Sequence, residues 1–131
     1  MIGIDTNVVV RYLVRDDRAQ AERAKRFFDD CRERDEHCFV GIVVLCELTW
    51  VLAACYDRSR EEVVEALQLV LSASLFEVER KDLVRQALEE FTERGGDFAD
   101  HIIGAVSRDE GCATTVTFDQ GLKKSAAFTT L

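Results

Sequence analysis

The sequence predicts an α/β domain in which a central parallel sheet is flanked by helices. Short apolar runs alternate with longer segments whose apolar residues recur at helical spacing. Of the 131 residues, none is proline, 47% are hydrophobic and 32% are charged, which is typical of one globular domain with a single core. Strands that alternate with helices favour a parallel sheet, because each crossover then runs through a helix. We therefore expect residues 1–131 to form one domain.

Five short apolar runs predict the strands, because turn-forming or polar residues bound them. They cover residues 1–4, 38–40, 74–78, 112–117 and 127–130. The segments between them predict helices. One begins near residue 7, and the others cover about residues 19–34, 43–56, 60–71, 83–94 and 98–110. The valines at 8–10 favour a strand by propensity, but Val9, Tyr12 and Leu13 share one helical face, so we expect a helix there.

Several helix boundaries follow from capping residues. Ser59 with Glu62 three residues later is the pattern of a capping box at the start of the 60–71 helix. Asp82 is the expected N-cap of the 83–94 helix. Gly111 is well placed to end the helix that begins at Phe98.

Composition and charge restrict the class of protein. The run from residue 38 to 56 is apolar enough to suggest a membrane span, but Glu47 would lie near mid-bilayer, so we expect no membrane segment. Five cysteines without a zinc-type spacing are expected to be buried thiols, and no N-terminal signal is visible, which together indicate the cytoplasm. The net charge of −8 argues against a general nucleic-acid binder, but not against an enzyme that meets phosphate through carboxylate-held metal ions.

A stretch near the C-terminal end holds two closely spaced acids. Gly95 and Gly96 interrupt the helical pattern, Asp97 can cap a new helix, and Asp100 follows three residues later. Such a pair at a helix start is an expected capping pair, with Asp97 as N-cap and Asp100 at the third helical position. On this stretch alone, capping is the favoured interpretation.

Three other acids stand in comparable positions. Asp5 and Asp119 end predicted strands, which is where ligands bind in open parallel sheets. Glu47 is the only charge in a helix that is apolar nearly all round, and a buried carboxylate needs a cation, a metal or a proton. Singly, Asp5 could cap a helix, Asp119 could open a turn, and Glu47 could pair with a distant arginine. Together with Asp100 they indicate an oxygen-ligand site for Mg²⁺ or Mn²⁺.

Other candidate residues carry less information. Neither His37 nor His101 has the serine or cysteine partner of a catalytic triad, and no glycine-rich nucleotide loop is present. Gly3 and Gly104 are expected at close-packed positions, and Trp50 in the core.

Four segments in this order resemble a PIN domain of the VapC type, the toxin ribonucleases of bacterial and archaeal toxin–antitoxin pairs. They are residues 2–7 (IGIDTN), 44–52 (VLCELTWVL), 97–105 (DFADHIIGA) and 115–119 (TVTFD). The first segment alone is weak, but all four in order cover essentially the whole chain.

The resemblance implies a single PIN domain whose five strands are ordered 3-2-1-4-5. It also implies a catalytic quartet, Asp5, Glu47, Asp100 and Asp119, which holds Mg²⁺ or Mn²⁺ with Asp97 as an auxiliary metal ligand. An RNA substrate, a cognate antitoxin and a homodimer follow from the same resemblance. His101 and Gly104 depart from the family pattern, which more often has small or apolar residues and alanine at these positions.

Metal ions held by such ligands imply hydrolysis of the RNA phosphodiester bond by a water molecule that attacks in line with the leaving group. This reaction leaves 5′-phosphate and 3′-hydroxyl ends. Thr117 or Thr6 could orient that water. The alternatives are a phosphoacceptor receiver domain that binds Mg²⁺, or an inactive PIN scaffold that only binds a partner. A receiver needs paired acids after its first strand and a lysine after its last, whereas here Asp5 stands alone. The four intact acids argue against an inactive scaffold.

Overall fold

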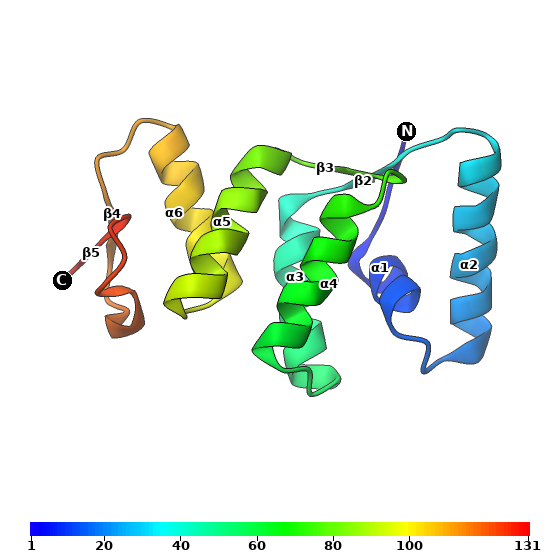
Figure 1. The fold of residues 1–131 in the computed structure, drawn as a ribbon, viewed down its shortest axis with the longest axis horizontal. Helices are drawn as coiled ribbons and strands as arrows, with labels where there is room; N and C mark the ends of the chain where they lie inside the picture. The colour runs from blue at the N-terminus through cyan, green and yellow to red at the C-terminus, as the bar shows by residue number, and fades with distance from the viewer. The chain divides into compact units, whose positions relative to one another are not determined.

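The computed structural model describes residues 1–131, which divide into two compact units, Met1–Glu79 and Arg80–Leu131. Its strands form two parallel sheets, one ordered β1-β2-β3 and one ordered β4-β5 (Figure 1). The neighbours β3-β2-β1 and β4-β5 are among those that the resemblance implies, and the α/β class is confirmed. The expected single sheet with order 3-2-1-4-5 stays a prediction.

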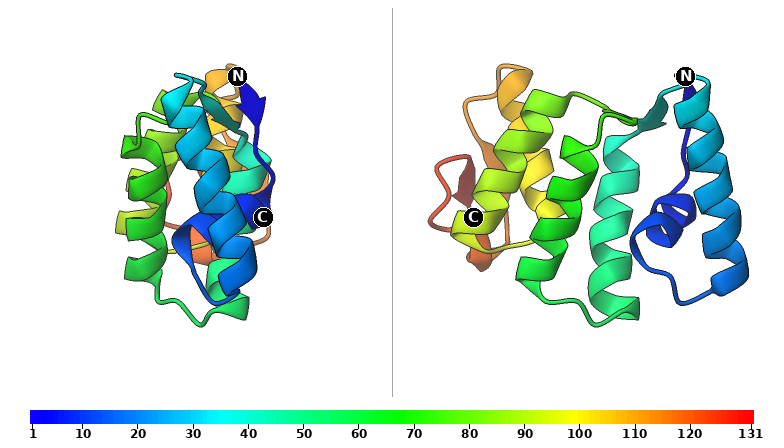
Figure 2. Two further views of the ribbon diagram at one scale, coloured as in Figure 1. Left: turned by 90° about the vertical axis from the view of Figure 1, so that its right-hand side faces the viewer. Right: turned by 45° about the vertical axis from the view of Figure 1, so that its right-hand side comes forward.

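The first unit carries a three-stranded sheet and four helices. In the sheet, Ile2 lies opposite Cys38, and Cys38 lies opposite Phe76. Helices α1 and α2 pack side by side, as do α3 and α4 (Figure 2). The elements are β1 (Ile2–Gly3), α1 (Thr6–Leu13), α2 (Arg18–Glu33), β2 (Cys38–Val40), α3 (Ile42–Cys55), α4 (Arg60–Ser72) and β3 (Phe76–Val78).

Aromatic rings fill the core of the first unit. Phe28 of α2 is only 1% exposed and meets the rings of Tyr12, Phe27 and Phe76 edge-on, with centroids 5.2, 5.3 and 5.6 Å away. Edge-to-face contacts at these distances are the preferred geometry of aromatic pairs. Tyr12 lies on the apolar face that predicts α1, so the helix forms despite the strand propensity of its valines.

The second unit consists of two packed helices followed by a two-stranded sheet. Phe91 and Phe98 meet edge-on between the helices, with ring centroids 5.9 Å apart. Gly104 is close-packed as expected, because a Cβ there would lie 2.9 Å from Cε2 of Phe128. The elements are α5 (Lys81–Arg94), α6 (Phe98–Asp109), β4 (Thr115–Thr117), the 3₁₀ turn η1 (Gln120–Leu122) and β5 (Phe128–Thr130).

Two capping predictions have opposite outcomes. The capping box at α4 is confirmed: the Ser59 hydroxyl accepts from the Glu62 N–H at 3.2 Å, and the Ser59 N–H donates to Glu62 Oε1 at 3.0 Å. The N-cap at Asp82 is wrong. Arg80 takes a left-handed conformation with φ of 45°, so α5 begins at Lys81 and Asp82 falls inside its first turn.

Some burial predictions need correction. Trp50 is 49% exposed rather than in the core, and no atom lies within 4 Å of a Cβ built at Gly3. Three cysteines are buried as expected, but Cys55 and Cys112 are exposed. Burial raises the pKa of the Cys38 thiol to about 11, which keeps it protonated and unreactive. No helix has the length and apolar character that crossing a membrane requires.

Candidate metal centre

Asp5 follows β1 and caps α1. Its Oδ1 accepts a hydrogen bond from the Thr6 N–H at 2.8 Å, and its backbone carbonyl accepts from Val8 and Val9. The capping interpretation of Asp5 is therefore confirmed. Because the cap uses Oδ1, the second oxygen, Oδ2, can serve as a ligand at the positively polarised start of the helix.

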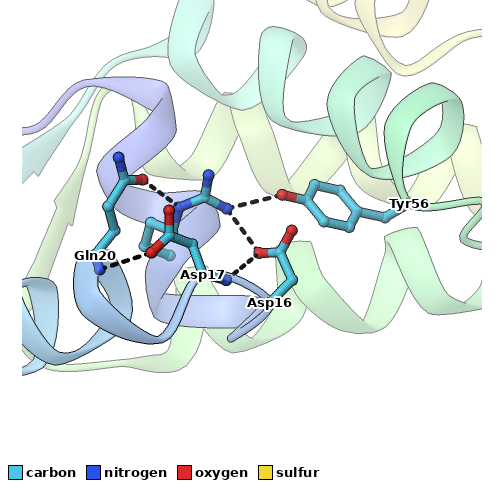
Figure 3. A network of polar contacts seen from close by, with 5 residues as sticks. Asp16, Asp17, Gln20 and Tyr56 are labelled. Atoms are coloured by element: carbon cyan, nitrogen blue, oxygen red, sulfur yellow. Dashed lines mark hydrogen bonds and ion pairs between the residues drawn. The ribbon is translucent and has the colours of Figure 1, made fainter.

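The far end of α1 is fixed by the guanidinium of Arg11. Its Nη1 donates to Asp16 Oδ1 and to the Tyr56 hydroxyl, each at 2.8 Å, and its Nε donates to Gln20 Oε1 at 2.7 Å. Figure 3 shows these partners converging from the loop before α2, from α2 itself and from the residue that ends α3. Arg11 thus ties α1 to α2 and α3, a role that its isolated position in the sequence does not reveal.

A cleft of about 600 Å³ lies beside β1, α1 and α2. Its lining is mostly apolar, with Asp5 and Asn7 among the polar residues and Arg11 and Arg23 as the basic ones. Asp5 therefore faces an open space and is not enclosed in the core of its unit.

Glu47 lies in the second turn of α3, which packs against α1. Contrary to expectation, its side chain is exposed. Val43 is 70% and Trp50 49% exposed, and both stand on the same face of α3 as Glu47. One face of this largely apolar helix is therefore open, so Glu47 is not the buried carboxylate that would need a cation. Exposure still leaves its carboxylate able to bind one.

A residue that the sequence did not single out caps this helix. Gly41 has no side chain with which to cap α3, and the Glu79 carboxylate supplies one in its place, because Oε2 accepts from the Ile42 N–H at 2.7 Å. A carboxylate at a helix N-terminus is favourable on electrostatic grounds. Glu79 thereby helps to hold the helix that carries Glu47.

Asp97 and Asp100 form a capping box at the start of α6, as predicted. The Asp97 N–H donates to Asp100 Oδ2 at 3.3 Å. Just before them, Gly95 and Gly96 have φ of 70° and 76°, a conformation that side chains rarely allow. The double glycine is therefore the feature that turns the chain sharply from α5 into α6.

Asp119 follows β4 and opens the turn η1, which is the turn-opening role that the sequence suggests for it. Its Oδ1 accepts from the Gly121 N–H at 2.8 Å, and its own N–H donates to Thr117 Oγ1 at 3.0 Å. The Thr117 hydroxyl therefore helps to fix Asp119, which is a different use from the water-orienting role considered above.

In the second unit, several neighbouring charges act on the carboxyl group of Asp100. The pKa of its carboxyl is raised above the usual range, first because burial disfavours the charged form and also because Asp97 and Asp119 are negative. The hydrogen bond from the Asp97 N–H and the charge of His101 act in the opposite direction. Mutual repulsion among three carboxylates is the electrostatic condition that a bound cation relieves.

The five candidate residues thus divide between the units. Asp5 and Glu47 lie on packed helices of the first unit, and the other three carboxylates interact within the second. Neither unit on its own gathers three or more His, Cys, Asp or Glu side chains into a group that could hold a metal ion. The donors themselves are all carboxylate oxygens, which fits Mg²⁺ or Mn²⁺.

The raised pKa of Asp100 leads to a prediction about the stability of the metal-free protein. Asp100→Asn should raise its melting temperature at neutral pH, because asparagine removes the disfavoured charge and keeps an oxygen for the Asp97 N–H. A raised pKa in the folded state means that the folded protein binds the proton more tightly than the unfolded chain does. Ionisation of Asp100 therefore costs stability as the pH rises above the usual aspartate pKa of about 3.9. The advantage of asparagine should therefore vanish as the pH falls below that value.

Melting curves in EDTA at several pH values test this, with Asp30→Asn on the exposed side of α2 as the matched control. A lower melting temperature for Asp100→Asn at neutral pH would show that its charge stabilises the fold.

Comparison with known proteins finds one family and one relative that match most of the chain. The family model described as "PIN domain" matches residues 2–127. Over 121 residues the chain is 29% identical to a protein of Aquifex aeolicus (strain VF5) named "VapC ribonuclease", covering 92% of this chain and 89% of that relative. The matched region includes all five candidate acids.

Proposed function

We propose that this chain, which belongs to the PIN domain family, is a Mg²⁺-dependent endoribonuclease that acts as the toxin of a toxin–antitoxin pair. The observation that carries the proposal is the interaction of three carboxylates at Asp97, Asp100 and Asp119 in a chain similar to a VapC ribonuclease along most of its length. A receiver domain is no longer an alternative, since the family is different.

The two units are proposed to form one PIN domain with strand order 3-2-1-4-5. The family match spans both units, which supports this. β1 pairs only with β2, and β4 only with β5, so each has an edge whose backbone groups can pair with another strand. A parallel pairing of β1 with β4 would bring the ends of both strands, and with them Asp5 and Asp119, to the same edge of one sheet.

In this arrangement Asp5, Glu47, Asp100 and Asp119 would hold one or two Mg²⁺ ions, with Mn²⁺ as a substitute, and Asp97 would be an auxiliary ligand. A bound Mg²⁺ would supply Lewis acidity, which polarises the scissile phosphate and lowers the pKa of an attacking water. Asp119 is oriented by Thr117 and by the turn at Gly121, while Asp100 is oriented by the Asp97 N–H. Thr6 is buried and its Oγ1 has no hydrogen-bond partner, which makes it the better-placed threonine to orient a polar group beside Asp5.

Product ends test the chemistry. Purified protein incubated with single-stranded RNA and Mg²⁺ should give fragments with 5′-phosphate and 3′-hydroxyl ends, and EDTA should stop cleavage. Fragments with 2′,3′-cyclic phosphate ends, or cleavage unaffected by EDTA, would contradict a metal-activated water. If the protein binds a partner but never cuts RNA, it is the inactive scaffold.

The toxin role requires a partner that inhibits the nuclease. The acidic carboxylates would favour a basic side chain, and arginine pairs with carboxylates bidentately. Expression of the chain alone should arrest growth, and co-expression with the small open reading frame beside its gene should restore growth and yield a complex. Harmless expression with no neighbouring product bound would end the toxin proposal but not the nuclease one. The chain is also proposed to be a homodimer, which a solution mass of twice 14.8 kDa would support.

A further inference from the structure

His101 is a buried histidine with a defined partner. Its side chain lies on α6 and the residue is only 3% exposed. Nε2 of its ring lies 2.6 Å from the carbonyl oxygen of Gly95. Because a carbonyl can only accept, Nε2 carries the hydrogen and donates it. The ring also packs edge-on against Phe91 of α5, with centroids 6.4 Å apart.

The bond of His101 ends on the residue that closes α5. Gly95 has φ of 70° and ψ of −160°, a region open essentially to glycine alone. A Cβ built on Gly96 would lie 3.3 Å from His101 Nε2 and 3.1 Å from Leu122 Cδ2. The turn is therefore shaped around the imidazole ring, and its first carbonyl is fixed by that ring.

The same turn leads directly into the acids of the second unit. Asp97 is the next residue, and its N–H binds Asp100 Oδ2, so the direction of this N–H sets the position of the Asp100 carboxylate. His101 follows Asp100 on the helix and reaches back over the turn. The His101 side chain, which follows the two acids in the sequence, thereby binds Gly95, which precedes them.

We propose that His101 is a positioning residue, whose Nε2–H bond to the Gly95 carbonyl fixes the Gly95–Gly96 turn and thereby aims Asp97 and Asp100 at a divalent cation. This rests on the proposed metal-dependent function. His101 is not a catalytic residue, because it is buried and its donor is used by the backbone. The bond replaces a solvent contact that a carbonyl at a helix end otherwise needs.

Two variants separate the hydrogen bond from the packing. The amide nitrogen of His101→Gln can reach the place of Nε2 and donate, whereas His101→Leu fills similar space without a donor. His37→Leu, which changes the other, exposed histidine, is the matched control. Mn²⁺ affinity would be measured by calorimetry, folding by circular dichroism, and kcat and KM with RNA.

Loss of a group that orients metal ligands typically weakens metal binding about 10–100-fold. His101→Leu should therefore bind Mn²⁺ at least about tenfold more weakly than the unchanged protein and show a lower kcat with KM little changed. His101→Gln should recover most of the affinity, and His37→Leu should bind as the unchanged protein does. Equal Mn²⁺ binding by folded His101→Leu, or no recovery in folded His101→Gln, would overturn the proposal.

A measurement on the unchanged protein keeps the test valid even if His101→Leu fails to fold. Nitrogen-15 NMR of the imidazole should show a slowly exchanging hydrogen on Nε2, and a ring protonated on Nδ1 alone would overturn the proposal. If the proposed metal-dependent function itself is wrong, the unchanged protein should bind no Mn²⁺ at all, and His101 then has no positioning role. This result differs from one in which the unchanged protein binds Mn²⁺ and the His101 variants bind it equally well.

Discussion

Asp5→Asn, Glu47→Gln, Asp100→Asn and Asp119→Asn should each lower the rate of RNA cleavage by about a hundredfold or more. Each change removes one negative charge from the set of oxygens proposed to hold the metal, while the volume of the side chain hardly changes. Changing a residue that only orients a metal ligand already costs up to about a hundredfold, so the loss of a direct ligand should cost at least as much. The measurement is cleavage of a labelled RNA at saturating Mg²⁺.

Folding must be intact in all four variants. Asp5 and Asp119 accept their capping bonds through one oxygen, which asparagine retains, so circular dichroism should be unchanged. Asp30→Asn and Glu65→Gln remove the same charge from exposed helix positions and should cleave RNA normally. Full activity in any two variants of the quartet would refute the assignment.

Phe28→Ala should lower the free energy of unfolding by about 3–5 kcal/mol, the usual cost of truncating a buried phenylalanine. Phe28 is 1% exposed and is the centre of the ring cluster that joins α1, α2 and β3. A small domain is stable by only about 5–15 kcal/mol, so the variant should be close to unfolding. Urea denaturation followed by circular dichroism measures the change.

Leu69→Ala provides the comparison, because Leu69 is 58% exposed on α4 and alanine suits a helix. Its free energy of unfolding should stay within about 0.5 kcal/mol of the unchanged protein. A loss below about 1 kcal/mol for Phe28→Ala, in the range of exposed positions, would mean that the aromatic cluster is not the core of the first unit.

Local sequence patterns predicted the features that depend on neighbouring residues. The capping boxes of α4 and α6 follow from acids three residues after the cap, and both are present. The caps at Asp5 and Asp119 follow from the place of each acid directly after a predicted strand. In each case the interacting atoms are at most three residues apart, so no knowledge of packing is needed.

Features that depend on tertiary packing were predicted less well. Helix α3 is apolar nearly all round, so no stripe of polar residues marks its open face, and the sequence predicts burial of Glu47 and Trp50, which are both exposed. The bond from His101 to Gly95 depends on a glycine turn whose geometry the sequence does not specify. Arg80 in a left-handed conformation was missed because such positions are usually occupied by glycine, asparagine or aspartate.

The candidate site illustrates the same limit. Each acid could be found singly, because Glu47 is the only charge in its helix and the other four stand at strand ends or helix starts. Their assembly depends on contacts between residues distant along the chain. The unusual positions of these acids indicate one shared site, and the family resemblance, carried by four ordered segments, implies the same set of Asp5, Glu47, Asp100 and Asp119.

Calorimetric titration of Mn²⁺ into Asp5→Asn tests most directly whether acids from both units form one metal site. This variant leaves Asp97, Asp100 and Asp119 unchanged in Arg80–Leu131, so the comparison isolates the contribution of Met1–Glu79. If the acids share one site, Asp5→Asn should bind Mn²⁺ much more weakly than the unchanged protein, and adding Asp100→Asn should weaken it by less than the sum of the separate effects. Unchanged Mn²⁺ affinity in Asp5→Asn would contradict a shared site.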